Sequence, residues 1–246
     1  MTGIIKITSR TNNKIKDICF IKENPLAEQF WLEGKHFVKD IDNEQIQLLV
    51  FTDPSGLEDK IEKLCALNIP VYNVTPDVMK KICDTTSIQN IGAIVKKPFV
   101  QMPDKLILLD RLQDPGNAGT IIRTAAAFGY GVIFGEGSVN PFSSKVVRSS
   151  AGIINNCFVK SGNLEEEIPK LKSDGFKIFA AMLDKSSGSL NKLDKNHNIG
   201  IIIGNEGEGV SEKIASLSDK KVYIPINNNV ESLNAAVAAA IFMYSL

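Results

Sequence analysis

The sequence predicts an α/β protein of two domains, the second built on a parallel sheet. Short apolar runs alternate with helical patterns along most of the chain, as in α/β layer structures. In the second half, the runs 106–109 and 199–203 are continuously apolar, which is typical of parallel strands buried on both faces. Residues 98–104 contain two prolines and no periodicity. We therefore expect a domain over 1–97, a linker over 98–104 and a second domain over 105–246.

The composition narrows the classes of function. The 246 residues carry 28 basic and 28 acidic side chains, so contact with nucleic acid requires a local basic patch rather than a global field. The four cysteines have no metal-ligand or CxxC spacing, and two histidines are too few for a histidine-based metal site. No apolar run approaches membrane-spanning length. We expect a cytoplasmic protein with reduced thiols, without a metal and without a membrane contact.

The first domain opens on a basic segment. Residues 6–22 contain five basic side chains and one acidic one, and Ile15 and Ile18 fall on one helical face. The outward charges are either an ordinary solvated helix face or a patch that contacts phosphates. The remaining pattern predicts strands over 30–32, 46–51, 71–74 and 91–95 and helices over 35–41, 57–67 and 76–84. This alternation predicts a small α/β/α domain.

The second domain repeats the alternation with longer apolar strands. Asn117 is expected to cap one helix and Ser232 the last one, since both residue types favour the N-cap position. A short helix over 143–150 carries Lys145 and Arg148. The other expected strands are 132–134, 156–159, 176–182 and 222–224, and the other expected helices are 164–172 and one that starts at Ser211.

Three loops in this domain combine glycine, asparagine and carboxylate residues. Residues 113–120, 204–211 and 225–234 each follow a buried-type strand and precede a helix. In an open parallel sheet such loops lie at the carboxyl ends of the strands, where ligands bind. The spacing of Gly204, Gly207 and Gly209 is not that of a dinucleotide fingerprint, so the glycines more simply allow backbone to approach a bound molecule.

Arg123 lies two turns into the helix after Asn117, among apolar and small residues. One interpretation is a structural ion pair with Glu206 or Glu231. The other is a planar donor fork for a phosphate or carboxylate. Taken singly, the polar loop residues are better explained as capping groups than as catalytic ones; these are Asn117, Glu206, Ser232 and Asn234.

Together, the three loops resemble a known set of motifs. The segments DPGNAGTIIRTAAAFG (114–129), IIIGNEGEGVSE (201–212) and IPINNNVESLNAAVAAAI (224–241) resemble, in order and spacing, the three signature motifs of the SpoU (TrmH-like) RNA 2′-O-ribose methyltransferases, a branch of the SPOUT superfamily. The first domain more loosely resembles the substrate-binding domain often fused to this family, which is similar to a ribosomal protein.

The resemblance implies a parallel-sheet domain with a C-terminal trefoil knot, a homodimer with a shared active site, and S-adenosylmethionine as methyl donor. The implied substrate is structured RNA, with rRNA expected rather than tRNA. The implied catalytic residues are Asn117, Arg123, Glu206, Ser232 and Asn234. The implied cofactor-binding residues are Ile203, Gly204, Ile224, Asn228 and Leu233. The residues expected to contact RNA are Arg10, Lys14, Lys16 and Arg148.

The third motif departs from the family pattern. Ile226 and Asn228 stand where the family usually has Met and Gly, and Ala235-Ala236 replaces Val-Ser. Asn tolerates positive φ, so the turn is compatible with this sequence. Because arginine stays protonated in proteins, we interpret Arg123 as a clamp on the target phosphate rather than a free base, and Glu206 as the group that orients Arg123 or the third loop.

The leading hypothesis is therefore transfer of a methyl group from S-adenosylmethionine to a ribose 2′-hydroxyl of RNA. A catalytically inactive RNA-binding protein with the same fold is the alternative. A metabolite-binding α/β enzyme that uses another nucleotide is a third class. Binding of S-adenosylmethionine distinguishes the methyltransferase from the enzyme that uses another nucleotide. Methyl transfer to RNA distinguishes the methyltransferase from the inactive RNA-binding protein.

Overall fold

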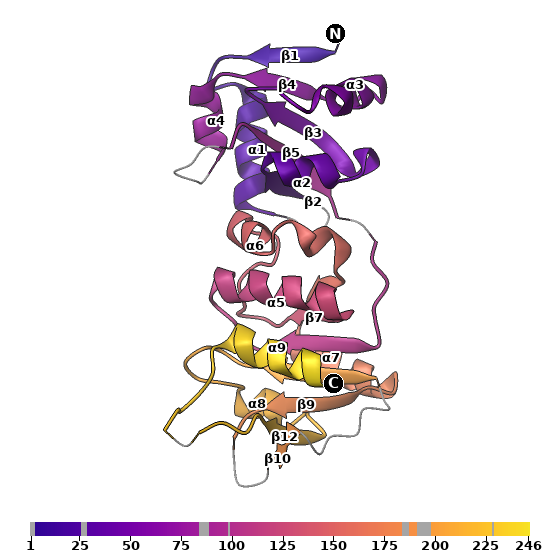
Figure 1. Ribbon diagram of the computed structural model, residues 1–246, viewed down its shortest axis with the longest axis vertical. Coiled ribbons are helices and arrows are strands. Elements are labelled where there is room, and N and C mark those ends of the chain that lie inside the picture. Colours follow the sequence, from indigo (N-terminus) through magenta and orange to yellow (C-terminus); the bar gives the residue numbers. More distant parts are fainter. Residues whose placement is uncertain are drawn as a thin grey trace. The chain divides into compact units, whose positions relative to one another are not determined.

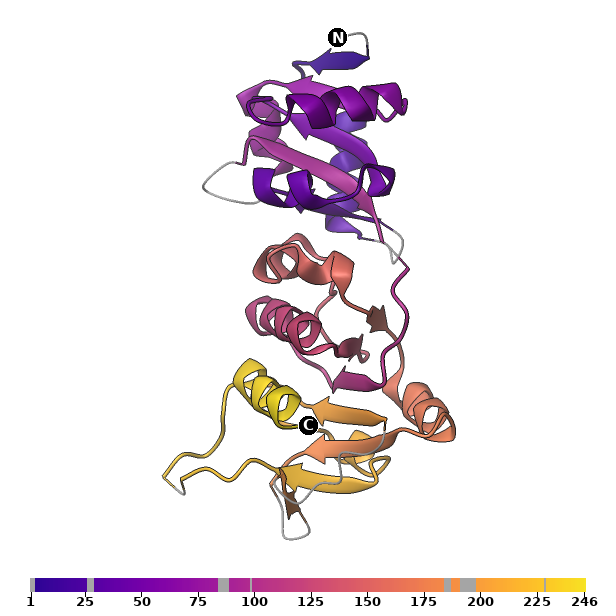
Figure 2. The same ribbon diagram turned by 45° about the vertical axis from the view of Figure 1, so that its right-hand side comes forward.

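The computed structural model describes residues 3–25, 29–83, 89–97, 99–183, 187–190, 198–227 and 229–246. The chain forms two compact units. One comprises Met1–Phe99 with Phe142–Arg148, and the other Val100–Pro141 with Ser149–Leu246. Figures 1 and 2 show the elements of each unit coloured along the sequence.

The first unit contains a five-stranded mixed sheet. The strand order is β1 (Ile4–Ile7), β4 (Val71–Val74), β3 (Ile46–Phe51), β5 (Ile91–Lys96) and β2 (Gln29–Glu33). β4 pairs in parallel with both β1 and β3, whereas β5 pairs antiparallel with β3 and β2. β1 is an edge strand that the sequence pattern did not predict, since Ile7 alone of its four residues is buried.

Helices cover both faces of this sheet (Figure 1). α1 (Asn13–Glu23) and α4 (Pro76–Ile82) share one core cluster, in which Ile15 and Ile18 pack with Val78 and Met79. α2 (Lys35–Asp40) contacts β2 and β5, while α3 (Glu58–Ala66) contacts β4. The α6 helix (Ser144–Ser149) lies largely in the segment grouped with this unit. The apolar face predicted at Ile15 and Ile18 is therefore the buried face of α1.

The second unit is organised on a seven-stranded sheet whose strand pairings are all parallel. The strand order is β10 (Gly188–Ser189), β12 (Lys220–Tyr223), β9 (Lys177–Ala181), β11 (Ile199–Ile203), β6 (Lys105–Leu109), β7 (Gly131–Phe134) and β8 (Val159–Ser161). The central strands β11 and β6 are almost wholly buried, so the prediction of an α/β fold with a parallel sheet is confirmed.

Two helix layers enclose this sheet. α7 (Leu164–Ser173) and α8 (Glu212–Ala215) share a core cluster with alternate residues of the central strands, including Leu106 and Leu108. The intervening residue Ile107 is equally buried and faces the opposite side, because side chains alternate along a strand. There α5 (Pro115–Phe128) and α9 (Ala235–Ser245) pack against each other, and α9 also contacts β11 (Figure 2).

Several local expectations were wrong in detail. Asp114, not Asn117, caps α5, because Pro115 fits the first helical position and the Asp114 carboxylate accepts a hydrogen bond from Asn117 N at 2.7 Å. Asn234, not Ser232, caps α9 by accepting from the backbone of Ala236 and Val237. The strand expected over 156–159 is a 3₁₀ turn (Ile153–Asn156) followed by β8.

Candidate functional site

The three polar loops meet at one edge of the parallel sheet. They follow β6, β11 and β12, which run in the same direction, so their carboxyl ends share that edge. The site is built by segments that are distant in sequence, and it lies wholly within the second unit.

Glu206 joins the second loop to the first. Its carboxylate accepts hydrogen bonds from Gln113 N at 3.2 Å, Asp114 N at 3.0 Å and Asn117 Nδ2 at 3.0 Å. Burial alone would raise the pKa of Glu206, but these bonds, together with one from its own backbone, outweigh burial and hold the pKa below its usual value. The carboxylate thus lies at the N-terminus of α5, where the helix dipole favours a negative charge.

Asn117 extends this connection to the third loop. Asn234 Nδ2 donates to Asn117 Oδ1 at 2.9 Å, while Asn234 Oδ1 caps α9. Each amide therefore uses its oxygen and its nitrogen on different partners, which fixes the orientation of both side chains. The chain from Glu206 through Asn117 to Asn234 is a continuous hydrogen-bonded link across all three loops.

A cavity of about 380 Å³ opens beside this link. Its size falls within the range of small-molecule sites, roughly 300–1,000 Å³. The walls come from the ends of β9, β11 and β12, the loop 204–209, the segment around 224–233, and α9. Four predicted cofactor residues line it, namely Ile203, Gly204, Ile224 and Leu233, while Asn228 lies outside the described residues.

The loop after β11 folds back tightly on itself. Asn205 and Gly209 exchange backbone hydrogen bonds of 3.1 and 3.0 Å. A Cβ at Gly204 would lie 2.0 Å from the carbonyl carbon of Gly209, so no other residue fits there without moving backbone. The cavity wall at this point is consequently bare backbone, which suits recognition of a polar ligand by N–H and C=O groups.

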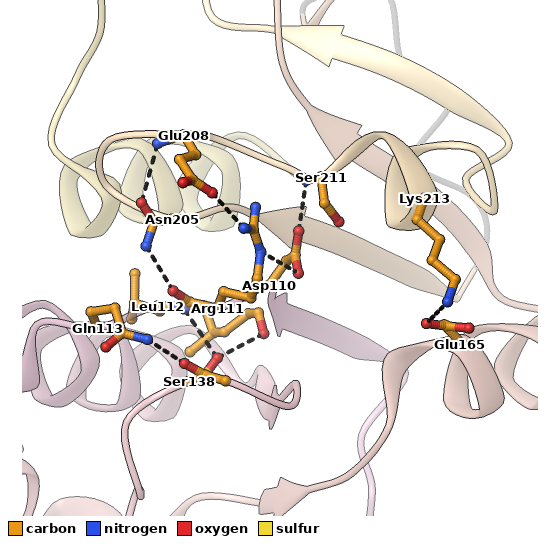
Figure 3. A network of polar contacts seen from close by, with 12 residues as sticks. Asp110, Arg111, Leu112, Gln113, Ser138, Glu165, Asn205, Glu208, Ser211 and Lys213 are labelled. Carbon is orange, nitrogen blue, oxygen red and sulfur yellow. Dashed lines mark hydrogen bonds and ion pairs between the residues drawn. The ribbon is translucent and has the colours of Figure 1, made fainter.

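A second polar network holds the loop after β11, and the sequence analysis did not predict this network. Asp110, buried at the end of β6, accepts from Ser211 N at 2.7 Å. Arg111 adopts φ +58° and pairs with both Asp110 and Glu208, and the Glu208 hydrogen bond is the main cause of its raised pKa. Asn205 Nδ2 donates to Arg111 O (Figure 3). The one available signal was an Asp-Arg pair ending a buried strand.

Two predicted catalytic residues are not part of the hydrogen-bonded link. Arg123 is exposed on α5, and within the described ranges its guanidinium has no hydrogen-bond or ion-pair partner. Neither Glu206 nor Glu231 pairs with it. Ser232 is exposed and lines the cavity. Glu206 therefore holds the first loop through Asn117 and does not orient Arg123 in this structure.

The residues expected to contact RNA lie in the first unit. Lys14 and Lys16 are exposed on α1, and Arg10 forms an exposed ion pair of 3.6 Å with Asp77. Arg148 instead donates to the buried carboxylate of Glu33 at 3.1 Å, with 28% of its side chain exposed. The RNA contacts of these residues remain predictions.

Across the part of the chain that the structure describes, no group of three or more His, Cys, Asp or Glu side chains is placed to hold a metal ion. The same residues include no helix with the length and apolarity needed to cross a bilayer.

Comparison with known proteins decides the family. The sequence model of the SpoU rRNA Methylase family matches residues 104–244. The chain belongs to the SpoU rRNA methylase family. It is similar to the 23S rRNA (guanosine(2553)-2′-O)-methyltransferase RlmP of Bacillus subtilis (strain 168), with 31% identity over 98% of each chain. This assignment confirms the family that the three motifs resemble.

Solved structures of SpoU-type enzymes have the same fold. The rRNA methyltransferase from Sinorhizobium meliloti superimposes with a TM-score of 0.87 at 28% identity, covering 99% of this chain and 97% of that one. Its AdoMet-bound form gives a TM-score of 0.86 with the same coverage. Membership of the SpoU rRNA Methylase family confirms the predicted methyltransferase class. The AdoMet bound in that similar structure is the cofactor that the three motifs imply.

Proposed function

We propose that the protein transfers the methyl group of S-adenosylmethionine to a ribose 2′-hydroxyl of rRNA. The observation that carries this proposal is the Glu206–Asn117–Asn234 link, which ties three loops together beside a cavity of ligand size. The similar Bacillus subtilis enzyme is named for a guanosine of 23S rRNA, and this supports rRNA over tRNA.

The cavity has the features that the cofactor requires. Gly204 presents bare backbone, and Ile224 and Leu233 contribute main chain and apolar side chains from the third loop. When bound, S-adenosylmethionine supplies a methyl group on a sulfonium. Because its transfer is an in-line displacement, the contribution of the protein is mainly positioning. The link through Asn117 and Asn234 serves that purpose by holding the second and third loops, which line the cavity, to the first loop.

Arg123 is assigned to the RNA. Its guanidinium is exposed and unpaired within the described residues, so binding a phosphate oxygen breaks no existing contact. A planar fork of donors suits a phosphate, and its positive charge favours loss of the neighbouring hydroxyl proton. Ser232, exposed at the cavity, is assigned to positioning the ribose.

The first unit is assigned to binding structured RNA. Lys14 and Lys16 project from α1, and Lys81 on the adjacent α4 donates to the backbone of Arg10. These side chains form a local basic face on a chain of zero net charge, as phosphate contact requires. Arg148 is assigned to the same role, which it would serve through the 28% of its side chain that is exposed.

The proposal includes a homodimer formed through α5 and α9. Phe128, Val237 and Tyr244 on these helices are 45%, 49% and 80% exposed, and the Phe128 and Tyr244 rings lie 6.1 Å apart. Exposed apolar side chains on two helices that pack together are typical of an interaction surface. A second copy there would cover these side chains and bring its own residues close to the exposed Arg123 on α5. The proposal also includes a trefoil knot through which the C-terminal segment is threaded. It includes a cytoplasmic location, which an rRNA substrate supports.

The test is methyl transfer to deproteinised rRNA from a strain that lacks the protein, with labelled S-adenosylmethionine. The expected product is one 2′-O-methylated nucleotide, mapped by nuclease digestion. Calorimetry with S-adenosylmethionine is run in parallel. RNA binding without methyl transfer would support the inactive RNA-binding alternative, and failure to bind S-adenosylmethionine would support a different nucleotide ligand.

A further inference from the structure

A second cavity, of about 390 Å³, opens at the same edge of the parallel sheet. It lies beyond the ends of β7 and β8, between the loop 135–141 and the turn 161–163. Because β6, β7 and β8 are parallel neighbours, this cavity and the loops that carry Asn117 share one edge. Nothing in the proposed methyl transfer uses it.

Gln113 connects the two cavities directly. Its backbone N–H donates to Glu206 in the first site, and its side-chain amide donates to the carbonyl of Gly137 on the rim of the second. Leu112 N donates to Ser138 Oγ at 3.0 Å, and Val139 N donates to Leu112 O at 2.8 Å. Figure 3 shows Gln113 directed toward the turn that carries Ser138. Gln113 therefore contacts both Glu206 of the hydrogen-bonded link and the rim of the second cavity.

The lining suits a flat heterocycle better than a phosphate. Gly135, Gly137 and Gly162 line the cavity with backbone, and Val139 and Pro141 supply apolar surface. Among the described residues neither Lys nor Arg lines the cavity, whereas Glu136 does. The Glu136 carboxylate is exposed, and it has no hydrogen-bond or ion-pair partner in the described part of the chain. An acidic, uncompensated lining repels phosphate and accepts N–H donors.

We propose that this cavity holds a guanine base of the RNA, at or next to the methylated nucleotide, and that Glu136 accepts from its Watson–Crick edge. Guanine presents two adjacent N–H donors that one carboxylate accepts together. Proteins read RNA sequence by splaying bases out and bonding these edges. The inference rests on the proposed RNA methyl transfer and deepens it, because it assigns the residue that selects the base.

The test compares Glu136→Gln with the wild-type protein on short transcripts that span the mapped nucleotide. Inosine, which lacks the 2-amino group, replaces guanosine at the methylated position and at each neighbour in turn. At one position inosine is expected to lower wild-type kcat/KM by about 10-fold, mainly through KM, since a bidentate contact discriminates by that order. Glu136→Gln is expected to lose a similar factor on guanosine and to stop discriminating against inosine.

Glu166→Gln is the matched control, since Glu166 lies on α7 outside the cavity with 68% of its side chain exposed. Its kinetics, and the affinity of both variants for S-adenosylmethionine, are expected to match those of the wild-type protein. Undiminished discrimination by Glu136→Gln, or equal use of inosine at every position, would overturn the base site alone. No methyl transfer by the wild-type protein would overturn the proposed function, and this inference with it.

Discussion

Asn117 and Asn234 are 117 residues apart in the sequence and are joined by a hydrogen bond of 2.9 Å from Asn234 Nδ2 to Asn117 Oδ1. Because Glu206 accepts from the other end of Asn117, the bond couples the N-termini of α5 and α9 to the loop after β11. The first loop and the two loops that line the cavity thus depend on one another, and disturbing any of them is expected to affect cofactor binding and turnover together.

Replacing Arg123 tests the clamp. Arg123→Ala is expected to lower kcat/KM for RNA by about 100-fold, the scale seen when a group that stabilises transition-state charge is removed. Stability and affinity for S-adenosylmethionine are expected to stay near wild-type values, because the side chain is exposed and unpaired within the described residues. Methylation kinetics, thermal unfolding and calorimetry measure the three quantities. Near-normal turnover by a folded dimer would contradict the assigned role.

Replacing Glu206 tests the link. Glu206→Ala leaves three N–H donors without their acceptor and is expected to cost about 1 kcal/mol in the free energy of unfolding. Turnover is expected to fall as the loops lose their mutual positions. Glu206→Gln retains one acceptor oxygen for the N–H groups of Gln113 and Asp114 and is expected to recover part of the loss. Equal activity for both variants and the wild-type protein would exclude a role in positioning.

The same carboxylate gives a pH dependence of stability. The folded-state pKa of Glu206 lies below its unfolded value, so its contribution is present above the unfolded pKa and is lost as pH falls through the folded pKa. The stability advantage of the wild-type protein over Glu206→Gln is therefore expected to hold from neutral pH to about 5 and to shrink below about 4. Urea unfolding across this range measures it. A pH-independent difference would show that charge is not involved.

Gly204 tests the bare wall of the cofactor cavity. In Gly204→Ala the new methyl group meets the Gly209 backbone at 2.0 Å, so the loop has to shift. Overpacking of this kind costs about 1–3 kcal/mol, and we expect S-adenosylmethionine to bind about 10-fold more weakly. Calorimetry measures the change. Gly188→Ala is the control, since no atom of the described residues lies within 4 Å of its new methyl group. Equal affinities for the two variants would refute this reading of the wall.

Gly119 tests the packing that holds α5. A Cβ there would lie 2.3 Å from Ser149 Cβ and 2.7 Å from Ser150 N, both at the C-terminal end of α6. Gly119→Ala is expected to destabilise the protein by about 1–3 kcal/mol, because backbone cannot yield as a flexible side chain can. Thr120→Ala, one position along at an exposed site, is expected to stay within about 0.5 kcal/mol. Denaturant unfolding compares them.

The proposed dimer face is tested by charge. Tyr244→Lys places a cation among the exposed apolar side chains of α5 and α9, and we expect it to convert the dimer to a monomer in sedimentation experiments. Phe20→Lys, at a residue 65% exposed on α1, is expected to leave the dimer intact. A wild-type protein that sediments as a monomer would remove the dimer from the proposal.

Much of the fold follows from local pattern. The runs of β6 and β11 are continuously apolar because helix layers bury both of their faces. This pattern allowed both strands to be predicted from the sequence. β1 and β10 were not predicted, since short edge strands bury few side chains and leave no period. The predicted N-caps of α5 and α9 differ from the observed ones because two good capping residues lie near the start of each helix. Tertiary contacts decide between them.

The sequence alone determined the family, the parallel sheet and the three loops of the site, because motif order, spacing and apolar runs are properties of the chain. Tertiary structure decided which partners the polar residues take. Glu206 bonds Asn117 rather than Arg123, and Arg111 supports the second loop, because parallel strands bring distant loops to one edge in a register that no local pattern encodes. The second cavity, which Glu136 lines, also depends on tertiary structure, because residues beyond the ends of β7 and β8 form it together.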